Sequence, residues 1–145
     1  MTARIVWIVL GISFGPALAQ TPTSPCLSYE PGAVKLSGIL VRKTFPGPPN
    51  YEDIHRGDRP ETYWLLNLPQ PVCVDEDKRD PDLNPAHDGI RIVQLVLTGE
   101  AYKKYKNLVG KRVVATGTLF CEHTGHHHTP VLLTVNALAR AEAGH

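Results

Sequence analysis

The sequence has very little net charge. It contains 15 Lys and Arg against 14 Asp and Glu. Removing Arg4, which lies in an apolar N-terminal segment, leaves 14 basic residues against the 14 acidic ones. Proteins that bind nucleic acid through its phosphates carry an excess of basic side chains on one face. The balance argues against a general polyanion binder, and we expect no nucleic acid partner.

Long hydrophobic runs are absent after the first twenty residues. At the N-terminus Arg4 precedes an apolar run over 5–14, and a Gly-Pro break and the small residues of 17–19 follow. The run is too short to span a bilayer, so residues 1–19 predict a cleaved secretory signal. An uncleaved membrane tether is the alternative. We expect an exported protein, periplasmic or extracellular, with no stable membrane insertion after cleavage.

Cysteine is also scarce. The three cysteines are Cys26, Cys73 and Cys121. In an exported protein two of them are expected to form a disulfide, which leaves one thiol over. Which two pair depends on the fold.

A regular series of strand-like segments fills most of the remaining chain. Strands are predicted at 33–43, 62–68, 90–97, 112–121 and 131–140, a short helix at 100–108, and long loops at 44–61 and 69–89. Residues 20–31 predict a flexible leader and 142–145 a tail. The order predicts one mainly β domain over 32–141, a five-stranded OB-fold-like barrel with its helix between strands 3 and 4. An open five-stranded sheet covered by the helix is the competing fold.

Gly38 interrupts the first predicted strand. The apolar residues before it, Val34 and Leu36, occupy alternate positions in one phase. Those after it, Ile39 and Val41, occupy the opposite phase. A change of phase at a glycine predicts a bulge or bend in the strand.

The predicted barrel also selects a disulfide. Strands one and two form an antiparallel pair, so the start of the first lies beside the end of the second. Cys26 precedes the first strand and Cys73 follows the second. These two residues should therefore come within disulfide range, and Cys121 is expected to remain free.

The most unusual stretch is CEHTGHHHTP, residues 121–130. If Thr124 and Gly125 form a two-residue turn, strand alternation puts Cys121, His123, His126 and His128 on one face. One thiolate and three imidazoles suit zinc or copper as a cofactor. The alternatives are a solvated polar turn without a metal and a catalytic pair of Cys121 with a histidine.

The loop over 44–61 offers a second set of contacts. Its candidate ligand-binding residues are Tyr51, Glu52, His55 and Asp58. In an OB fold this loop and the histidine stretch flank the face that usually binds ligands. Trp64, just after the loop, is predicted to lie in the core, with a place in a binding wall as the alternative.

Several signatures together resemble a known family. They are PGPPNYE over 46–52, GDRPE over 57–61, W-x-L-x-L over 64–68, and GTLF…TGHHHTPVLL within 117–133. This combination resembles the bacterial domain of unknown function 4431. The resemblance covers about residues 26–137 and implies an exported bacterial protein. It implies no activity, substrate or catalytic residue.

We therefore predict an exported, non-enzymatic binding module with its ligand face between 44–61 and 121–129. Its partner would be a small molecule, a metal or a protein. The first alternative is a periplasmic zinc- or copper-binding protein that uses the histidine stretch. The second is a hydrolase or a nucleic-acid binder, which the balanced charge and the absence of paired carboxylate or nucleophile motifs disfavour.

Overall fold

The computed structural model describes residues 25–142. The predicted signal over 1–19, the first part of the leader and most of the tail lie outside the described residues. The elements, in chain order, are β1 (Ala33–Pro46), η1 (Ile54–Arg56), β2 (Pro60–Val74), β3 (His87–Val96), α1 (Gly99–Tyr105), η2 (Lys106–Leu108), β4 (Arg112–Cys121) and β5 (Val131–Arg140). Among the described residues, none of the helices has the length and apolarity needed to cross a membrane.

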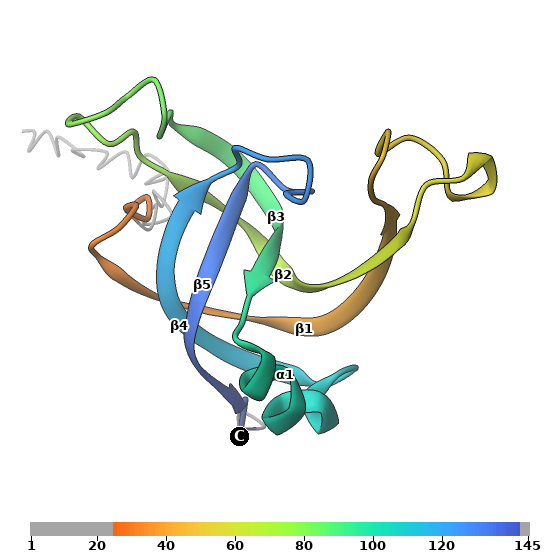
Figure 1. The fold of residues 1–145 in the computed structure, drawn as a ribbon. Helices are drawn as coiled ribbons and strands as arrows, with labels where there is room; N and C mark the ends of the chain where they lie inside the picture. Colours follow the sequence, from red (N-terminus) through yellow and green to blue (C-terminus); the bar gives the residue numbers. More distant parts are fainter. Residues whose placement is uncertain (1–24, 143–145) are drawn as a thin grey trace, which may run out of the picture.

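The five strands form a closed barrel in the order β1-β2-β3-β5-β4. β3 and β5 pair in parallel, and the other neighbouring pairs are antiparallel. α1 follows β3 and lies at one end of the barrel, away from the loops over 47–59, 75–86 and 122–130 (Figure 1). The predicted OB-fold-like barrel is confirmed, and the open sheet is wrong because β1 pairs with both β2 and β4.

Branched aliphatic side chains fill the barrel. Leu95, Leu119 and Leu133 lie side by side on three neighbouring strands, and all three are fully buried. Trp64 pairs with Leu95 on the neighbouring strand, and its ring meets Tyr102 of α1 edge-on, with the ring centroids 5.1 Å apart. Trp64 is 6% exposed, so its predicted place in the core is confirmed.

The first strand corrects the prediction for Gly38. The inward positions keep one phase from Leu36 through Gly38 to Leu40, and the register of β1 shows no shift with either neighbour. Ile39 pairs with both β2 and β4, so β1 passes from one partner to the other at this point. A Cβ on Gly38 would overlap the carbonyl of Asn67. The glycine permits close packing of β1 on β2, and there is no bulge.

β2 is longer than predicted. The sequence placed its end at Leu68 because prolines follow at 69 and 71, and proline cannot donate to a strand ladder. The strand nevertheless continues to Val74, with register shifts against β3 on both sides of Val72. Irregular pairing accommodates the prolines, and Cys73 lies within the strand instead of after it.

The N-terminal segment is packed against the barrel. The Leu27 N–H donates to the Cys73 carbonyl at 2.8 Å, and the Glu30 N–H donates to the Leu119 carbonyl at 3.0 Å. The Tyr29 ring is buried, and its hydroxyl donates to the Pro85 carbonyl at 2.8 Å. The predicted flexible leader is therefore wrong for residues 25–31, because Tyr29 supplies a buried ring that the composition of the segment did not suggest.

A disulfide joins Cys26 to Cys73, whose Cα atoms are 4.8 Å apart, and Cys121 is free. The predicted pairing is confirmed. Together with the backbone hydrogen bonds of Leu27, the bridge fixes the N-terminal segment to the end of β2.

Candidate functional site

Two loops meet on one side of the barrel. The Tyr51 hydroxyl lies 3.3 Å from Nε2 of His126, and the two rings pack edge-on. Gly125 lies against the Tyr51 ring, where an added Cβ would come within 3.1 Å of it. Tyr51 itself has a φ of 60°, in the left-handed region that non-glycine residues rarely adopt. The loop over 47–59 thus holds an unfavourable backbone angle at the residue that reaches the histidine loop.

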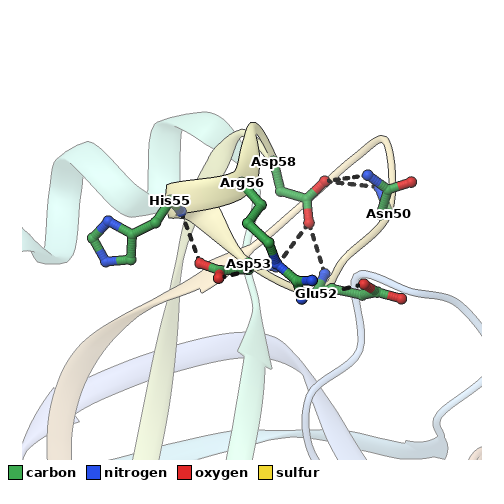
Figure 2. Close-up of polar contacts among 6 residues, drawn as sticks. All are labelled: Asn50, Glu52, Asp53, His55, Arg56 and Asp58. Atoms are coloured by element: carbon green, nitrogen blue, oxygen red, sulfur yellow. Dashed lines mark hydrogen bonds and ion pairs between the residues drawn. The ribbon is translucent and has the colours of Figure 1, made fainter.

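Asp58 organises the loop from which Tyr51 projects. Its carboxylate accepts the N–H groups of Asn50, Glu52 and Asp53 at 2.8–2.9 Å, and the Asn50 amide at 3.2 Å (Figure 2). These hydrogen bonds, those of the Asp53 and Glu52 N–H groups first, lower the pKa of Asp58. The side chain is buried and its acceptors are used within the loop. Asp58 was predicted to bind a ligand, and the structure gives it an internal role.

The other two candidates of this loop stand apart from the histidine stretch. Glu52 forms a surface ion pair with Arg56 at 3.5 Å. The His55 ring points away from the other labelled side chains in Figure 2. The backbone N–H of His55 bonds to Asp53, which caps the short helix η1. Of the four candidates in this loop, only Tyr51 meets the histidines.

A carboxylate, an imidazole and two phenols form the centre of the site. The Tyr63 hydroxyl donates to Oε2 of Glu61 at 2.7 Å, and His126 Nδ1 lies 2.8 Å from the same oxygen. An ionised Glu61 accepts both bonds, so His126 carries a proton on Nδ1, and in the neutral ring Nε2 then accepts from the Tyr51 hydroxyl. We call Tyr51, Glu61, Tyr63 and His126 the rim cluster.

Two members of the rim cluster, Glu61 and Tyr63, have a shifted pKa. The Tyr63 hydroxyl, and then His126, lower the pKa of Glu61, which keeps the carboxylate ionised at neutral pH. Burial, followed by the neighbouring Glu61, raises the pKa of Tyr63, so this phenol stays a donor. The His126 side chain is 48% exposed and presents its outer edge to solvent.

A small hollow lies beside the rim cluster. It measures about 180 Å³ and is lined by Tyr63, Gln94, Leu95, Val96, Tyr102, His126 and His127. Aliphatic and aromatic side chains form most of its wall, while Tyr63 and His126 bring hydrogen-bonding groups to it. The arrangement suits a ligand with one apolar ring and polar substituents at its edge.

Gln94 braces the histidine loop from the barrel. Its Nε2 donates to the His126 carbonyl at 2.9 Å, and its Oε1 accepts the His128 N–H at 2.8 Å. Its own N–H donates to the Thr129 hydroxyl at 3.0 Å. The side chain of Gln94 is almost completely buried, so this amide fixes the backbone on both sides of His127 and thereby the position of the His126 ring.

The predicted two-residue hairpin is wrong. Cys121 pairs with Val131, and the Glu122 N–H donates to the Pro130 carbonyl at 3.1 Å. The connection therefore spans 122–130, and its residues do not face one another across a strand ladder. The assumed register depended on a turn at Thr124 and Gly125, which the structure does not form.

The four predicted metal ligands have different neighbours as a result. Cys121 lies next to His87, His123 packs on His127, His126 bonds to Glu61, and His128 stacks on Phe45 at 3.9 Å between ring centroids. Within residues 25–142, the one group of three potential ligands consists of the disulfide cysteines and Asp88. The predicted zinc or copper site of one thiolate and three imidazoles on one face is not assembled.

Sequence reasoning missed Glu61, Tyr63 and Gln94. Glu61 and Tyr63 alternate on one face at the start of β2, directly after the loop that contains Tyr51. Gln94 is the polar residue within the apolar run IVQLVL, and a buried amide in such a run needs hydrogen-bond partners. These signals are present in the sequence, but they become specific only when the partner loop is known.

The comparisons with known proteins add a family-model match over part of the chain and a distant structural likeness. No curated protein matches the chain. A small single-stranded DNA-binding protein from Streptomyces coelicolor is similar over 76% of this chain and 94% of its own, at 16% identity and a TM-score of 0.36. At that score the likeness supports no functional assignment.

The model of the domain of unknown function DUF4431 matches residues 92–139. This is the family that the sequence signatures resemble. The signature within 117–133 falls inside the matched residues, and those over 46–68 fall outside them. The chain is thus similar to the DUF4431 family over residues 92–139, about a third of its length.

Proposed function

We propose that this protein is an exported, non-enzymatic binding module that takes a small ring-bearing molecule at the rim cluster. The observation that carries the proposal is the hydrogen-bonded chain from Glu61 through His126 to Tyr51 at the edge of an apolar hollow. The chain ends at exposed groups: Tyr51 is 38% exposed, and His126 is about half exposed. Polar groups fixed beside an apolar wall are the ordinary composition of a small-molecule site.

The position of the rim cluster supports a binding role. OB folds bind ligands on the face of strands 2 and 3 and at the loops joining strands 1–2 and 4–5. Glu61 and Tyr63 lie on β2, Tyr51 on the β1–β2 loop, and His126 on the β4–β5 loop. Both ring nitrogens of His126 already have partners, which holds the imidazole in one orientation for recognition.

Export is supported by the predicted signal and by the disulfide. Disulfides persist in oxidising compartments and are rare in the cytosol of mesophiles. The Cys26–Cys73 bridge is compatible with an exported protein. Intact mass spectrometry of protein purified from its native host tests the proposal, because cleavage after residue 19 predicts a mature chain that begins at Gln20.

Trp64 provides a direct test of ligand binding. The chain has two tryptophans, Trp7 and Trp64, so protein lacking residues 1–19 has one. Its ring contacts Tyr102, which lines the hollow. We expect at least one member of a panel of single-ring molecules, monosaccharides and small aromatic acids, to change this fluorescence in a saturable way.

Three variants locate the binding. Tyr63→Phe and His126→Gln should each weaken binding tenfold or more, because each removes a polar group beside the apolar wall. His55→Gln is the matched control and should bind normally, because His55 points away from the cluster. Binding that survives both cluster changes would place the ligand elsewhere. Tight zinc binding by the wild type that His126→Gln abolishes would favour a metal protein instead.

A further inference from the structure

Two reactive side chains meet where the start of β3 approaches the end of β4. The thiol of Cys121, the last residue of β4, lies 3.7 Å from Nε2 of His87, the first residue of β3. β5 stands between these two strands in the barrel, but it pairs with β3 only along Gln94, Leu95 and Val96. The first half of β3 has no β5 partner, and this gap lets His87 reach Cys121.

The environment of this pair contains a polar buried ring. Burial, and then the Cys121 sulfur, raise the pKa of Tyr29, so its hydroxyl stays protonated beside the thiol. That hydroxyl is fixed by its bond to the Pro85 carbonyl. Nδ1 of His123 is 3.1 Å from the Cys121 carbonyl, which positions a second imidazole next to the same residue.

Cys121 also borders a hollow large enough for a small organic molecule. The hollow measures about 520 Å³ and is lined by Glu30, Leu83, Asn84, Phe120, Cys121, His123 and Thr134. This volume lies within the range of ligand sites, roughly 300–1,000 Å³. Leu83 is 66% exposed and Phe120 adds an aromatic wall, so apolar surface is available to a bound molecule.

We propose that Cys121 and His87 form a thiol–disulfide exchange site that captures small organic disulfides from this hollow. As the Cys121 sulfur attacks one sulfur of the disulfide, Nε2 of His87 takes the thiol proton. A bond forms between Cys121 and the attacked sulfur, and the disulfide's own S–S bond breaks. The second half leaves as a thiolate and takes the proton back from His87. Cys121 is oxidised to a mixed disulfide, and the departing half is reduced to a thiol.

A disulfide is the co-reactant that suits the Cys121 thiol. Cys26 and Cys73 are oxidised to each other, while Cys121 keeps a thiol with an imidazole partner and an adjacent hollow. A nucleophile within reach of a base is the arrangement that activates a thiol. The pair uses no residue of the rim cluster, so this inference is independent of the proposed binding function.

Oxidised glutathione is the probe. The folded protein, incubated with it at neutral pH, should gain one glutathione at Cys121 as measured by intact and peptide mass spectrometry. The folded chain should react at least tenfold faster than the same chain unfolded in denaturant. A folded rate equal to or below the unfolded rate would overturn the proposal, because the half-buried thiol would then be merely shielded.

Variants separate activation from simple accessibility. Cys121→Ser should abolish the adduct, and His87→Gln should lower the rate tenfold or more while leaving the adduct at Cys121. His55→Gln is the control and should react like the wild type. Trp64 fluorescence confirms that each variant is folded. If folded His87→Gln reacts at the wild-type rate, the imidazole plays no part and the proposal fails.

Discussion

Asp58 and Glu61 are two carboxylates three positions apart with opposite uses. Asp58 accepts only from donors of its own loop, within residues 50–53. Glu61 accepts from the side chains of Tyr63 and of His126, which is 65 residues away in the chain. Both have a lowered pKa because of these hydrogen bonds.

The partners of a carboxylate, more than its pKa, distinguish the two roles. Asp58 satisfies backbone N–H groups that would otherwise lack partners, so it is needed for the shape of the loop. Glu61 orients an imidazole whose other nitrogen meets Tyr51 at the surface. In this molecule the lowered pKa of Glu61 marks the candidate site because its donors are side chains of the site, whereas the lowered pKa of Asp58 reflects the fold of its loop.

The largest loss of stability should come from disrupting the core of the barrel, on which the positions of both carboxylates depend. Leu133 is fully buried between Leu95 and Leu119, so Leu133→Asp would place an unpaired charge in the core. That burial costs several kcal/mol, against a typical total stability of about 5–15 kcal/mol. We expect no cooperative unfolding transition by circular dichroism. Asn136→Asp, on the exposed side of β5, should unfold like the wild type.

Asp58→Asn tests the role inside the loop. The asparagine offers one acceptor oxygen and turns an NH₂ group toward N–H donors. Hydrogen exchange at the amides of Asn50, Glu52 and Asp53 should accelerate by about tenfold or more as the loop opens locally. Glu52→Gln should leave those amides protected, because the Glu52 carboxylate contacts only Arg56 at the surface. Unchanged exchange in Asp58→Asn would contradict the scaffold role.

Glu61→Gln should change stability less and the histidine more. The rim cluster is partly exposed, so we expect a loss of about 1 kcal/mol or less in chemical denaturation. The His126 ring, however, loses the ionic acceptor that keeps its proton on Nδ1. Nitrogen chemical shifts of His126 should move toward a mixture of tautomers. A tautomer equilibrium identical to that of the wild type would show that Glu61 does not orient the ring.

Lowering the pH should produce the smallest changes in the free energy of unfolding, and these should occur in two stages. Burial lowers the pKa of His128 below its usual 6.5. As pH falls through about 6.5, the unfolded chain takes up a proton that the folded chain resists, so stability falls. The second stage begins below the usual 4.5 of Glu61, whose folded pKa is lower, and its contribution disappears as that pKa is passed.

Urea titrations across the acid range measure both stages. His128→Gln should flatten the first stage, leaving the share of His127, whose pKa burial also lowers. Glu61→Gln should flatten part of the second stage, and Asp58 accounts for another part. A stability curve that is level from neutral pH to about 5 would contradict the depressed histidines.

The fold was largely predictable because its signals are local. Strand patterns, the helix before β4 and the positions of Cys26 and Cys73 each follow from neighbouring residues. Gly38 was misjudged for a physical reason: Ile39 and Val41 are half-buried on the outward side, so the apolar pattern exaggerated a phase change.

The site was less predictable because it depends on loop conformation. Tyr51 was correctly placed near the histidines, but Asp58 looked equally suitable until its donors were known. The predicted metal site required a turn of two residues. Nothing in CEHTGHHHTP distinguishes such a turn from the longer connection over 122–130. Contacts such as Glu61 to His126 join distant residues, so one sequence does not specify them.

The order of the cysteines along the chain has a consequence for biosynthesis. An exported chain that crosses the membrane from its N-terminus brings Cys26 into the oxidising compartment first, Cys73 47 residues later and Cys121 last. The first two cysteines to arrive are the ones that pair, so the native bridge can form before the third thiol is present. This order of arrival favours the native pairing over a bridge to Cys121.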